Sequence, residues 1–482
     1  MICGVFVWFS RQPLWPTDLW DHINYGEHLL TSGEYASTEP LLSHVNTRMK
    51  WTDWGAKAIM AAIASAPEDG LPWLQIFHAS VVAAWAGVIT FGVFNTQGSA
   101  VAAMAACLAL IALNWQQIQI IRPQTMGLLL FAIVAIRITQ TSRSALGRNV
   151  VLLPAVFFLW ANLHGSFAIG LTLLGLTVCG RCLRASYNLG SMNKVPAGPR
   201  TQLQLLALVA SIAACTLNPA GPWVFADVLS IGRHPNMQFM FEWDALSLQM
   251  KQGKVFATFW VILIPIIWFS PRRTSVDRII WLLFFGGLTL WSARMINWFS
   301  CVFAIVLAEH AAAILRRKVP PIPQFHRRTA VWSVAAVVAL LVAVMASGPF
   351  VNRRSGNPYA FVAGRTPVGL TEHLVEEDLL KNSRVFAPAE WSGYLMRHRG
   401  DLQPLAHLHV HLIPPLIWAD QLSIHYARSD WQAAVDRNHL TAFIVDRRRN
   451  KRLIAKLAKD RRANLIWKNH QAAVFDWDSA AE

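Results

Sequence analysis

Charged residues are scarce in this chain of 482 residues: 15% are Asp, Glu, Lys or Arg, whereas 54% are hydrophobic. A soluble protein of this length needs more charge to cover its surface, which excludes a soluble globular protein. Apolar runs of roughly 15 to 24 residues recur instead, close to the length that a bilayer requires. The pattern predicts a polytopic membrane protein built of helices.

Cysteine is also rare, with six residues that lie mostly inside apolar runs. The predicted outer loops and the tail contain none, which excludes disulfide bonds there. The chain start lacks the basic leader of a cleavable signal peptide. Its apolar stretch, MICGVFVWFS, is too short to span, and we expect it to be the outer part of a first helix that begins upstream.

Acidic residues number 27 against 43 Lys and Arg, which gives a net charge of +16. Such an excess is common in nucleic-acid-binding proteins, but its placement excludes that class. The basic residues cluster in short loops between apolar runs, where Asp277 is the single acid: Arg143, Arg148, Arg181, Arg184, Lys194, Arg200, Arg272, Arg273, Arg278, Arg316, Arg317, Lys318, Arg327 and Arg328. The positive-inside rule predicts that these loops are cytoplasmic.

The apolar runs and basic loops together predict a membrane domain over residues 1–349. Helices are expected at 73–95, 98–115, 121–140, 149–161, 167–184, 201–217, 255–270, 279–294, 297–315 and 329–348. With the N-terminal stub they make about eleven crossings, with the N-terminus inside and the C-terminus outside. Two further segments, 18–32 and 53–66, are too short or too polar to cross, and their tryptophans favour helices along the outer interface.

The tail, residues 350–482, changes composition and is long enough to bury its own core. SRVFAPAEWSGYLMRH, TAFIVDRR, ANLIWKN and AAVFDWD are typical of short strands, and RRRNKRLIAKLAKDRRAN of a basic helix. The tail is therefore predicted to be a soluble α/β domain outside the membrane.

Titratable residues gather at the predicted outer surface, first in WPTDLWDHINYGEHLL. Asp18 and Asp21 are three residues apart, so on a helix they share a face, and His22 lies beside Asp21. Acids in this pattern favour a catalytic site. A solvated helix start, capped by Thr17 or Asp18, explains them equally directly.

Two arginines occupy the outer ends of predicted helices, Arg122 in IIRPQ and Arg294 in WSARMINWF. A charge at this depth is costly unless it is paired, and a guanidinium matches the oxygens of a phosphate. The pattern favours a site for a lipid-linked phosphate. Snorkelling to headgroups is the alternative explanation.

Polar residues also interrupt the apolar stretch FLWANLHGSFAIG, at Asn162 and His164. A break of this kind usually lines a cavity within the protein, because unsatisfied backbone cannot face lipid. A tight loop between two short helices is the alternative. Glu242 in FEWDAL is an outer acid that can reach the same site, or an ordinary solvated carboxylate.

The tail contains AHLHVHL, in which His407, His409 and His411 alternate. In a strand all three would project from one face, a spacing that suits zinc or copper. The sequence identifies no carboxylate or fourth ligand, so chance alternation remains the alternative.

Eight motifs follow one another in the order found in bacterial GT-C-type membrane glycosyltransferases, which the chain resembles. They are TDLWDHINYGEHLLTSGEYASTEPLLSHV, MKWTDWGAKAIMAAI, IRPQ, LWANLHGSF, TLNPAGPW, FEWDAL, SARMINWF and VFAPAEWSGYL. The family pattern opens with an aspartate, an aromatic, a histidine and a glycine. In this chain Asp21 stands where an aromatic is usual, and residues 37–40 replace the usual stretch between a proline and an aspartate.

The resemblance implies a GT-C-like fold and transfer of a sugar from a polyprenyl-phosphate donor to a saccharide, lipid or protein acceptor at the outer face of a bacterial inner membrane. It implies that Asp18 is the catalytic carboxylate, beside Asp21 and His22. An inverting transfer needs a base for the acceptor proton, and its leaving phosphate gains negative charge. The remaining implied site residues are Arg122, His164 and Arg294 for the phosphate, and Asn162, Glu242 and Asn297 along the wall.

No cofactor is indicated by the sequence, although a divalent metal ion between Asp18 and the phosphate is compatible with this chemistry. Two other functions remain open. A transporter for lipid-linked saccharides would show charges at mid-bilayer and related repeats in its halves, neither of which is visible. A non-catalytic scaffold would keep the architecture without turnover.

Overall fold

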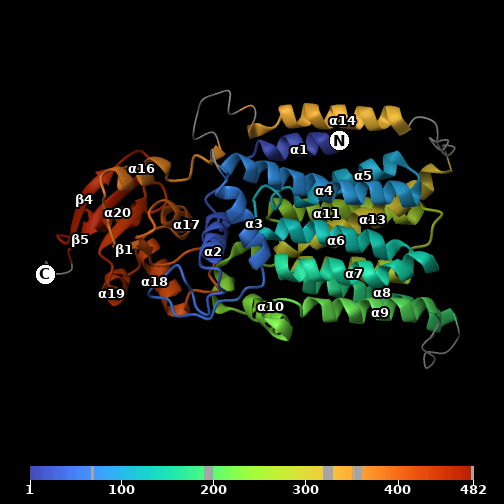
Figure 1. The fold of residues 1–482 in the computed structure, drawn as a ribbon, viewed down its shortest axis with the longest axis horizontal. Coiled ribbons are helices and arrows are strands. Elements are labelled where there is room, and N and C mark those ends of the chain that lie inside the picture. The colour runs from blue at the N-terminus through green and yellow to red at the C-terminus, as the bar shows by residue number, and fades with distance from the viewer. Residues whose placement is uncertain (67–69, 189–198, 318–328, 350, 352–360, 479–482) are drawn as a thin grey trace.

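A helical bundle and a smaller domain that contains a β-sheet lie end to end along the long axis of the molecule, with α2 and α3 between them (Figure 1). The computed structural model describes residues 1–482 except 67–69, 189–198, 318–328, 350, 352–360 and 479–482. The basic residues Lys194, Lys318, Arg327 and Arg328, and the first part of the predicted tail, lie outside the described residues.

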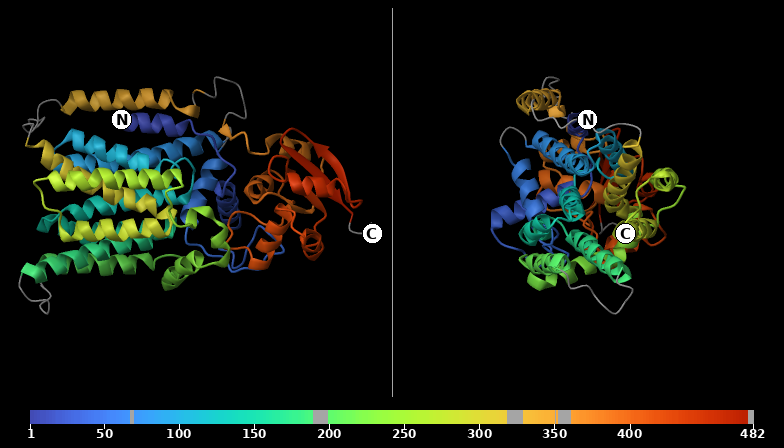
Figure 2. Two further views of the ribbon diagram at one scale, coloured as in Figure 1. Left: turned by 180° about the vertical axis from the view of Figure 1, so that it is seen from behind. Right: turned by 90° about the vertical axis from the view of Figure 1, so that its right-hand side faces the viewer.

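The bundle helices coincide with the predicted apolar segments to within a few residues, apart from α7. They are α1 (Ile2–Ser10), α4 (Leu71–Gln97), α5 (Ala100–Asn114), α6 (Pro123–Thr139), α7 (Arg143–Leu163), α8 (Phe167–Asn188), α9 (Pro199–Cys215), α11 (Lys251–Phe269), α12 (Val276–Trp291), α13 (Ile296–Leu315) and α14 (Thr329–Met345). Figure 2 shows α14 on the outside of the bundle beside α1.

Helix α7 differs from its prediction because it begins within the segment expected to be a loop. Ser142 caps it by accepting a hydrogen bond from the Ala145 N–H, so Arg143 and Arg148 lie on the helix. Five helical segments of the described part are long and apolar enough to cross a membrane by length and composition: Leu71–Gln97, Arg143–Leu163, Phe167–Arg184, Lys251–Phe269 and Ala293–Leu315.

The two polar helices predicted for the first outer loop, α2 (Leu19–Ser32) and α3 (Trp54–Ala64), are both present. They touch through backbone at Gly26, where a Cβ would lie 2.0 Å from the carbonyl oxygen of Lys57. Only glycine permits this approach. Gly33 then ends α2 in a left-handed conformation with φ of 70°.

The tail contains a five-stranded sheet in the order β2-β1-β3-β5-β4. Its strands are β1 (Arg384–Phe386), β2 (Gln403–Pro404), β3 (Ala442–Asp446), β4 (Ala463–Lys468) and β5 (Ala472–Trp477). Strands β1, β2 and β3 are parallel, whereas β5 is antiparallel to both β3 and β4. The four predicted strand segments each contribute a strand, and alternate residues of β3 bury into two separate hydrophobic clusters.

Helices surround the sheet: α16 (Val368–Glu376), α17 (Ala389–His398), α18 (Pro415–His425), α19 (Trp431–Arg437) and α20 (Lys451–Leu457). The expected strand over AEWSGYLMRH is wrong, because these residues form α17 with Trp391 and Leu395 buried four positions apart. The predicted basic helix is α20.

Helix α17 packs directly on α2 and joins the tail to the first outer loop. A Cβ at Gly393 would lie 2.3 Å from Oδ1 of Asp21, and Asn24 donates a hydrogen bond to the Gly393 carbonyl at 2.9 Å. Arg397 and Glu27 add an ion pair at 2.9 Å. These contacts place the tail against the end of the bundle that carries α2 and α3 (Figure 1).

Candidate functional site

A cavity of about 390 Å³ lies between the end of the bundle nearest the tail, α2 and a loop of the tail. Side chains from seven separated stretches of sequence meet around it. Its titratable and polar wall consists of Asp18, His22, Thr52, Asp53, Arg122, Gln124, His164, Ser166, Glu242, Arg294, His409 and His411. Of the predicted site residues, six line this cavity: Asp18, His22, Arg122, His164, Glu242 and Arg294.

Arg122 reaches the cavity because of the proline that follows it. Pro123 opens α6, and a residue before proline is driven out of the helical region, so Arg122 is extended with φ of −147° and ψ of 153°. Its Nε donates to Oδ1 of Asp18 at 2.9 Å. Asp18 occupies the N-cap position of α2 but makes no side-chain capping bond, so the capping explanation for its carboxylate is wrong.

Glu242 bridges the two arginines of the cavity. It lies in a short 3-10 turn (Phe241–Trp243), and its Oε2 accepts from Arg122 Nη1 at 2.8 Å. Its Oε1 accepts from Arg294 Nη1 at the same distance. Arg294, in the turn between α12 and α13, also donates to Gln124 at 2.7 Å. Neither arginine therefore points to headgroups, as snorkelling would require.

The acids of this chain of ion pairs are held ionised. Burial raises the pKa of Asp18, but Arg122, His22 and Arg294 together outweigh burial and lower the pKa below its usual range. The pKa of Glu242 is lowered in the same way, against burial, by Arg294 and Arg122. With two acids and two arginines, the cluster has no net charge, and a phosphate can enter only by displacing or rearranging one of the pairs.

His164 faces the cavity as a neutral imidazole. It caps the C-terminal end of α7, where the predicted break in the apolar stretch is confirmed. Its Nδ1 accepts a hydrogen bond from the Ser166 N–H at 3.1 Å, which leaves the proton on Nε2. Burial, with the nearby charge of Arg294, lowers its pKa to about 3. His164 can therefore donate a hydrogen bond to an anion without carrying charge.

His22 and Asp53 form a second pair on the cavity wall. The Nδ1 of His22 lies 3.5 Å from Oδ2 of Asp53, and Lys57 contacts Oδ1 of Asp53 at 2.9 Å from a fully buried position. Burial lowers the pKa of His22 to about 4, against the opposing effect of Asp53. His22 is thus a neutral base beside Asp18. Asp53 was not among the predicted site residues, although its spacing to Lys57 in TDWGAK is that of a helical ion pair.

The tail histidines lie in an irregular loop rather than a strand, so the predicted alternation on one face is wrong. His409 and His411 line the cavity, whereas His407 turns toward Tyr25 and Glu39. The structure also supplies the carboxylate that the sequence did not identify, because Oδ2 of Asp21 lies 3.6 Å from Nδ1 of His409. Two groups of possible metal ligands result, Asp21–His407–His409 and His22–Asp53–His409, each with ligand atoms within 4.8 Å.

Three predicted site residues lie outside the cavity wall. Asp21 does not share a face with Asp18, because α2 begins only at Leu19 and Asp21 accepts a hydrogen bond from the Leu408 N–H at 3.0 Å. Asn162 accepts from Trp54 Nε1 at 2.7 Å and fixes α3 to α7. Asn297 is buried within α13 in the bundle core.

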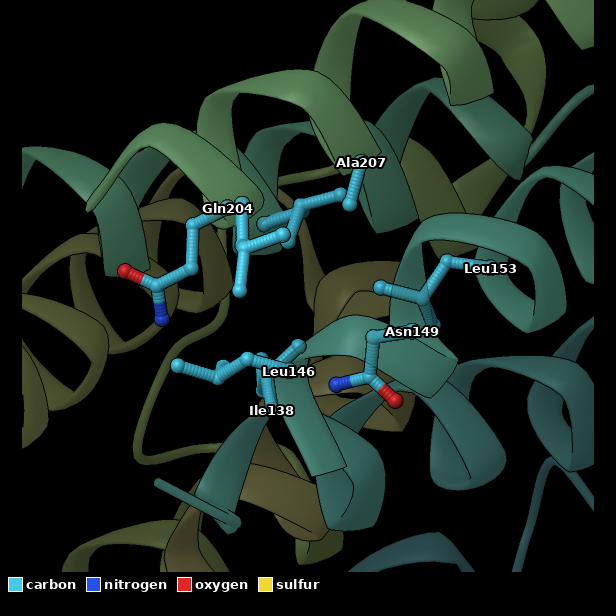
Figure 3. Close-up of a pocket in the computed structure, with 8 residues that line it drawn as sticks. Ile138, Leu146, Asn149, Leu153, Gln204 and Ala207 are labelled. Carbon is cyan, nitrogen blue, oxygen red and sulfur yellow. The ribbon is translucent and has the colours of Figure 1, made fainter. Parts of the chain in front are cut away.

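A much smaller pocket lies among the bundle helices, and Figure 3 shows the residues that line it. Its walls come from α6, α7, α8 and α9, and include Asn149 and Gln204. Its volume of about 10 Å³ is enough for one water molecule and no substrate. The cavity beside Asp18, unlike this pocket, has room for a ligand.

No protein-family model matches the sequence, and no curated protein matches it. Solved structures do match it. ArnT from Cupriavidus metallidurans in the apo state superposes with a TM-score of 0.56 and 15% identity, over 98% of this chain and 96% of that one. The same enzyme bound to undecaprenyl phosphate gives 0.52 and 14%, over 99% and 97%.

An oligosaccharyltransferase from Archaeoglobus fulgidus in the apo form gives a TM-score of 0.51 and 11% identity, over 92% of this chain and 67% of that one. The chain has the fold of the GT-C membrane glycosyltransferases. The expected GT-C-like architecture is confirmed at this level. At such low identities the likeness concerns the fold, and the chemistry depends on the residues of the cavity itself.

Proposed function

We propose that this chain is a membrane glycosyltransferase that moves a sugar from a polyprenyl-phosphate donor to an acceptor hydroxyl. The observation that carries the proposal is the chain of ion pairs Asp18–Arg122–Glu242–Arg294 along the wall of a cavity that can hold a ligand. The GT-C fold supports it, and so does the ArnT structure solved with undecaprenyl phosphate.

Arg122 and Arg294 are proposed to hold the donor phosphate. The carboxylate of Glu242 already bridges them with one oxygen on each guanidinium, so the two arginines are spaced for a single anion with two oxygens. A phosphate would compete for the same donors. Charge on the leaving polyprenyl phosphate grows as the sugar departs, and fixed positive groups in a partly dehydrated cavity stabilise it. The Nε2–H of His164 would add a neutral donor.

Asp18 is proposed to act as the general base. In the ligand-free state its hydrogen bond with Arg122 makes it a weak base, because a lowered pKa reduces the tendency to accept a proton. Donor binding would draw Arg122 toward phosphate and release Asp18. The carboxylate then takes the acceptor's hydroxyl proton, the hydroxyl oxygen bonds to the anomeric carbon, and the bond from that carbon to the phosphate oxygen breaks with inversion. His22, neutral and adjacent, would keep Asp18 oriented.

The proposed topology places the site at the outer membrane surface. Helices α1, α4 to α9 and α11 to α14 would make eleven crossings of a bacterial inner membrane, with residues 1–349 as the catalytic domain and residues 350–482 outside. The acceptor, a saccharide, a lipid or a protein, would then approach from the aqueous side.

The test is release of polyprenyl phosphate by purified full-length protein in lipid nanodiscs, offered a panel of polyprenyl-phosphate sugars and acceptors. Asp18→Asn is compared with Asp244→Asn, an exposed acid of the same outer surface that lies outside the cavity wall. Release by wild type and Asp244→Asn, with loss in Asp18→Asn, would support the proposal. Equal release by all three proteins would remove Asp18 from the mechanism.

A further inference from the structure

Asp21 is a buried carboxylate with too few partners. Its side chain is 1% exposed, and its Oδ1 has no hydrogen-bond partner among the described residues. The described part of the chain provides no Lys or Arg ion pair for it, and the basic groups near it are His407 and His409. A buried carboxylate is strongly destabilising unless a positive charge or several donors compensate it. A bound cation would supply such a charge.

The spacing between Asp21 and His409 suits a metal ion better than a hydrogen bond. Their ligand atoms are 3.6 Å apart, beyond the usual ~2.7–3.2 Å of an N–H···O bond. Tetrahedral zinc with bonds of ~2.0–2.1 Å separates neighbouring ligands by about 3.3 Å. The Nδ1 of His409 is also buried without a hydrogen-bond partner among the described residues. The unpartnered Nδ1 of His409 thus faces Oδ2 of Asp21, whose one hydrogen bond comes from the Leu408 N–H.

His407 has the surroundings of a metal ligand. Its Nε2 lies 2.9 Å from the hydroxyl of Tyr25 and 3.8 Å from Oε2 of Glu39, and Tyr25 donates to Glu39. Ligating histidines typically use their second ring nitrogen in this way, toward a carboxylate or another polar group. Nδ1 is then available for the metal, in place of its present bond from the His409 N–H at 3.2 Å.

We propose that Asp21, His407 and His409 bind a divalent transition-metal ion, with zinc as the probe, between α2 and the tail loop. Asp21 and Glu39 together contribute two negative charges, which one divalent cation neutralises. Two imidazoles and a carboxylate are a ligand set that zinc accepts. Asp21 and His407 lie behind the cavity wall, whereas His409 is part of that wall. It would fix residues 408–411, which line the cavity, to the first outer loop.

The experiment measures zinc in the full-length protein in nanodiscs, after chelation and dialysis against Zn²⁺, by mass spectrometry of the metal. One zinc per chain is expected. Asp21→Asn and His409→Gln should each lose it, whereas His411→Gln, in the same loop but in neither ligand group, should keep it. Tyr25→Phe, which removes a partner of His407, should weaken binding about 10- to 100-fold.

X-ray absorption at the zinc edge of the wild type gives an answer that does not depend on how variants fold. Nitrogen and oxygen neighbours at ~2.0–2.1 Å with scattering from two imidazoles are expected, whereas sulfur at ~2.3 Å would assign the zinc to cysteines and overturn the proposal. Substoichiometric zinc in the wild type would also overturn it. The proposal would also be overturned if His22→Gln and Asp53→Asn lost zinc while Asp21→Asn retained it. The zinc content is measured without turnover, so this experiment tests the metal site independently of the proposed transferase activity.

Discussion

Nε of Arg122 lies 2.9 Å from Oδ1 of Asp18, although the two residues are 104 positions apart in the chain. This pair joins the segment before α2 to the start of α6 and favours the ionised form of the proposed base. In the proposed mechanism it would couple catalysis to donor binding, because a phosphate that attracts Arg122 would change the basicity of Asp18.

Replacement of Asp18 by Asn should lower turnover by about 10²- to 10⁴-fold, the usual contribution of a general base. Binding of polyprenyl phosphate should persist, since Asn is of similar size and leaves both arginines in place. Turnover and ligand binding are measured on the same nanodisc preparation. Loss of binding together with turnover would show that Asp18 has a structural role instead.

Changes at Glu242 and Arg294 should affect donor affinity in opposite directions. Glu242→Gln removes the carboxylate that competes for the two arginines, so polyprenyl phosphate should bind more tightly. Arg294→Gln removes a charged hydrogen-bond donor worth about 1.5–3 kcal/mol, so affinity should fall roughly 10- to 100-fold. Titration with polyprenyl phosphate measures both, with the exposed Arg233→Gln as the control. Changes of the same sign in both variants would contradict the proposed competition.

The pH dependence of turnover should reveal the effect of Arg122 on Asp18. Arg122 lowers the pKa of Asp18, whereas burial raises it. The wild-type carboxylate therefore stays ionised at pH values below the usual pKa of an aspartate. The activity that depends on Asp18 should fall only as the pH drops through this lowered pKa. In Arg122→Gln burial acts unopposed by that charge. The acidic limb of the pH–activity profile should then move to higher pH in this variant. His22 and Arg294 are the remaining groups that favour ionisation of Asp18. An unchanged limb would mean that another group titrates.

The buried pair of Asp53 and Lys57 should matter for stability. Lys57 is 1% exposed, and Asp53→Asn would leave its charge without this partner, which typically costs about 3–5 kcal/mol. Asp53→Asn with Lys57→Met should recover part of that loss. The pKa of Asp53 is lower in the folded chain than in the unfolded chain, where it is about 3.9. The contribution of Asp53 to the free energy of unfolding is therefore complete above a pH of about 3.9 and is lost as the pH falls through the lower pKa of the folded chain. Thermal unfolding of the single and double variants measures this coupling.

Alanine at Gly393 should detach α17 from α2. Its Cβ would meet Oδ1 of Asp21 at 2.3 Å and the Asp21 backbone nitrogen at 2.9 Å, so the helices must separate. Gly369, also in a tail helix, has its nearest neighbour at 3.8 Å, and alanine there should stabilise the helix by up to about 1 kcal/mol. Limited proteolysis between bundle and tail should distinguish the two variants. Equal resistance would show that α2 adapts to the added methyl group.

The sequence alone determined the bundle helices and four of the five strands, but not β2 or the helices α16, α18 and α19. Apolar runs, basic loops and the tail's short strands are local signals, because each records a property of neighbouring residues, such as length, periodicity or charge. They located the bundle helices, the two helices of the first outer loop and all four predicted strand segments. The cap at Ser142 and the helix over AEWSGYLMRH were missed, because strand and helix patterns are ambiguous over so few residues.

Only the tertiary structure decided which polar residues meet. Asp18, Arg122, Glu242 and Arg294 were candidates one by one, but no local pattern shows that they form one chain of ion pairs. Asp21 and Asp18 are neighbours in sequence and have different surroundings, because the start of α2 at Leu19 turns one to the cavity and the other to the tail loop. The carboxylate near His407 and His409 lies almost 390 positions away, in contact with the tail only because Gly393 lets α17 approach α2. Contacts at such separations depend on packing of whole helices, which the composition of a short segment does not record.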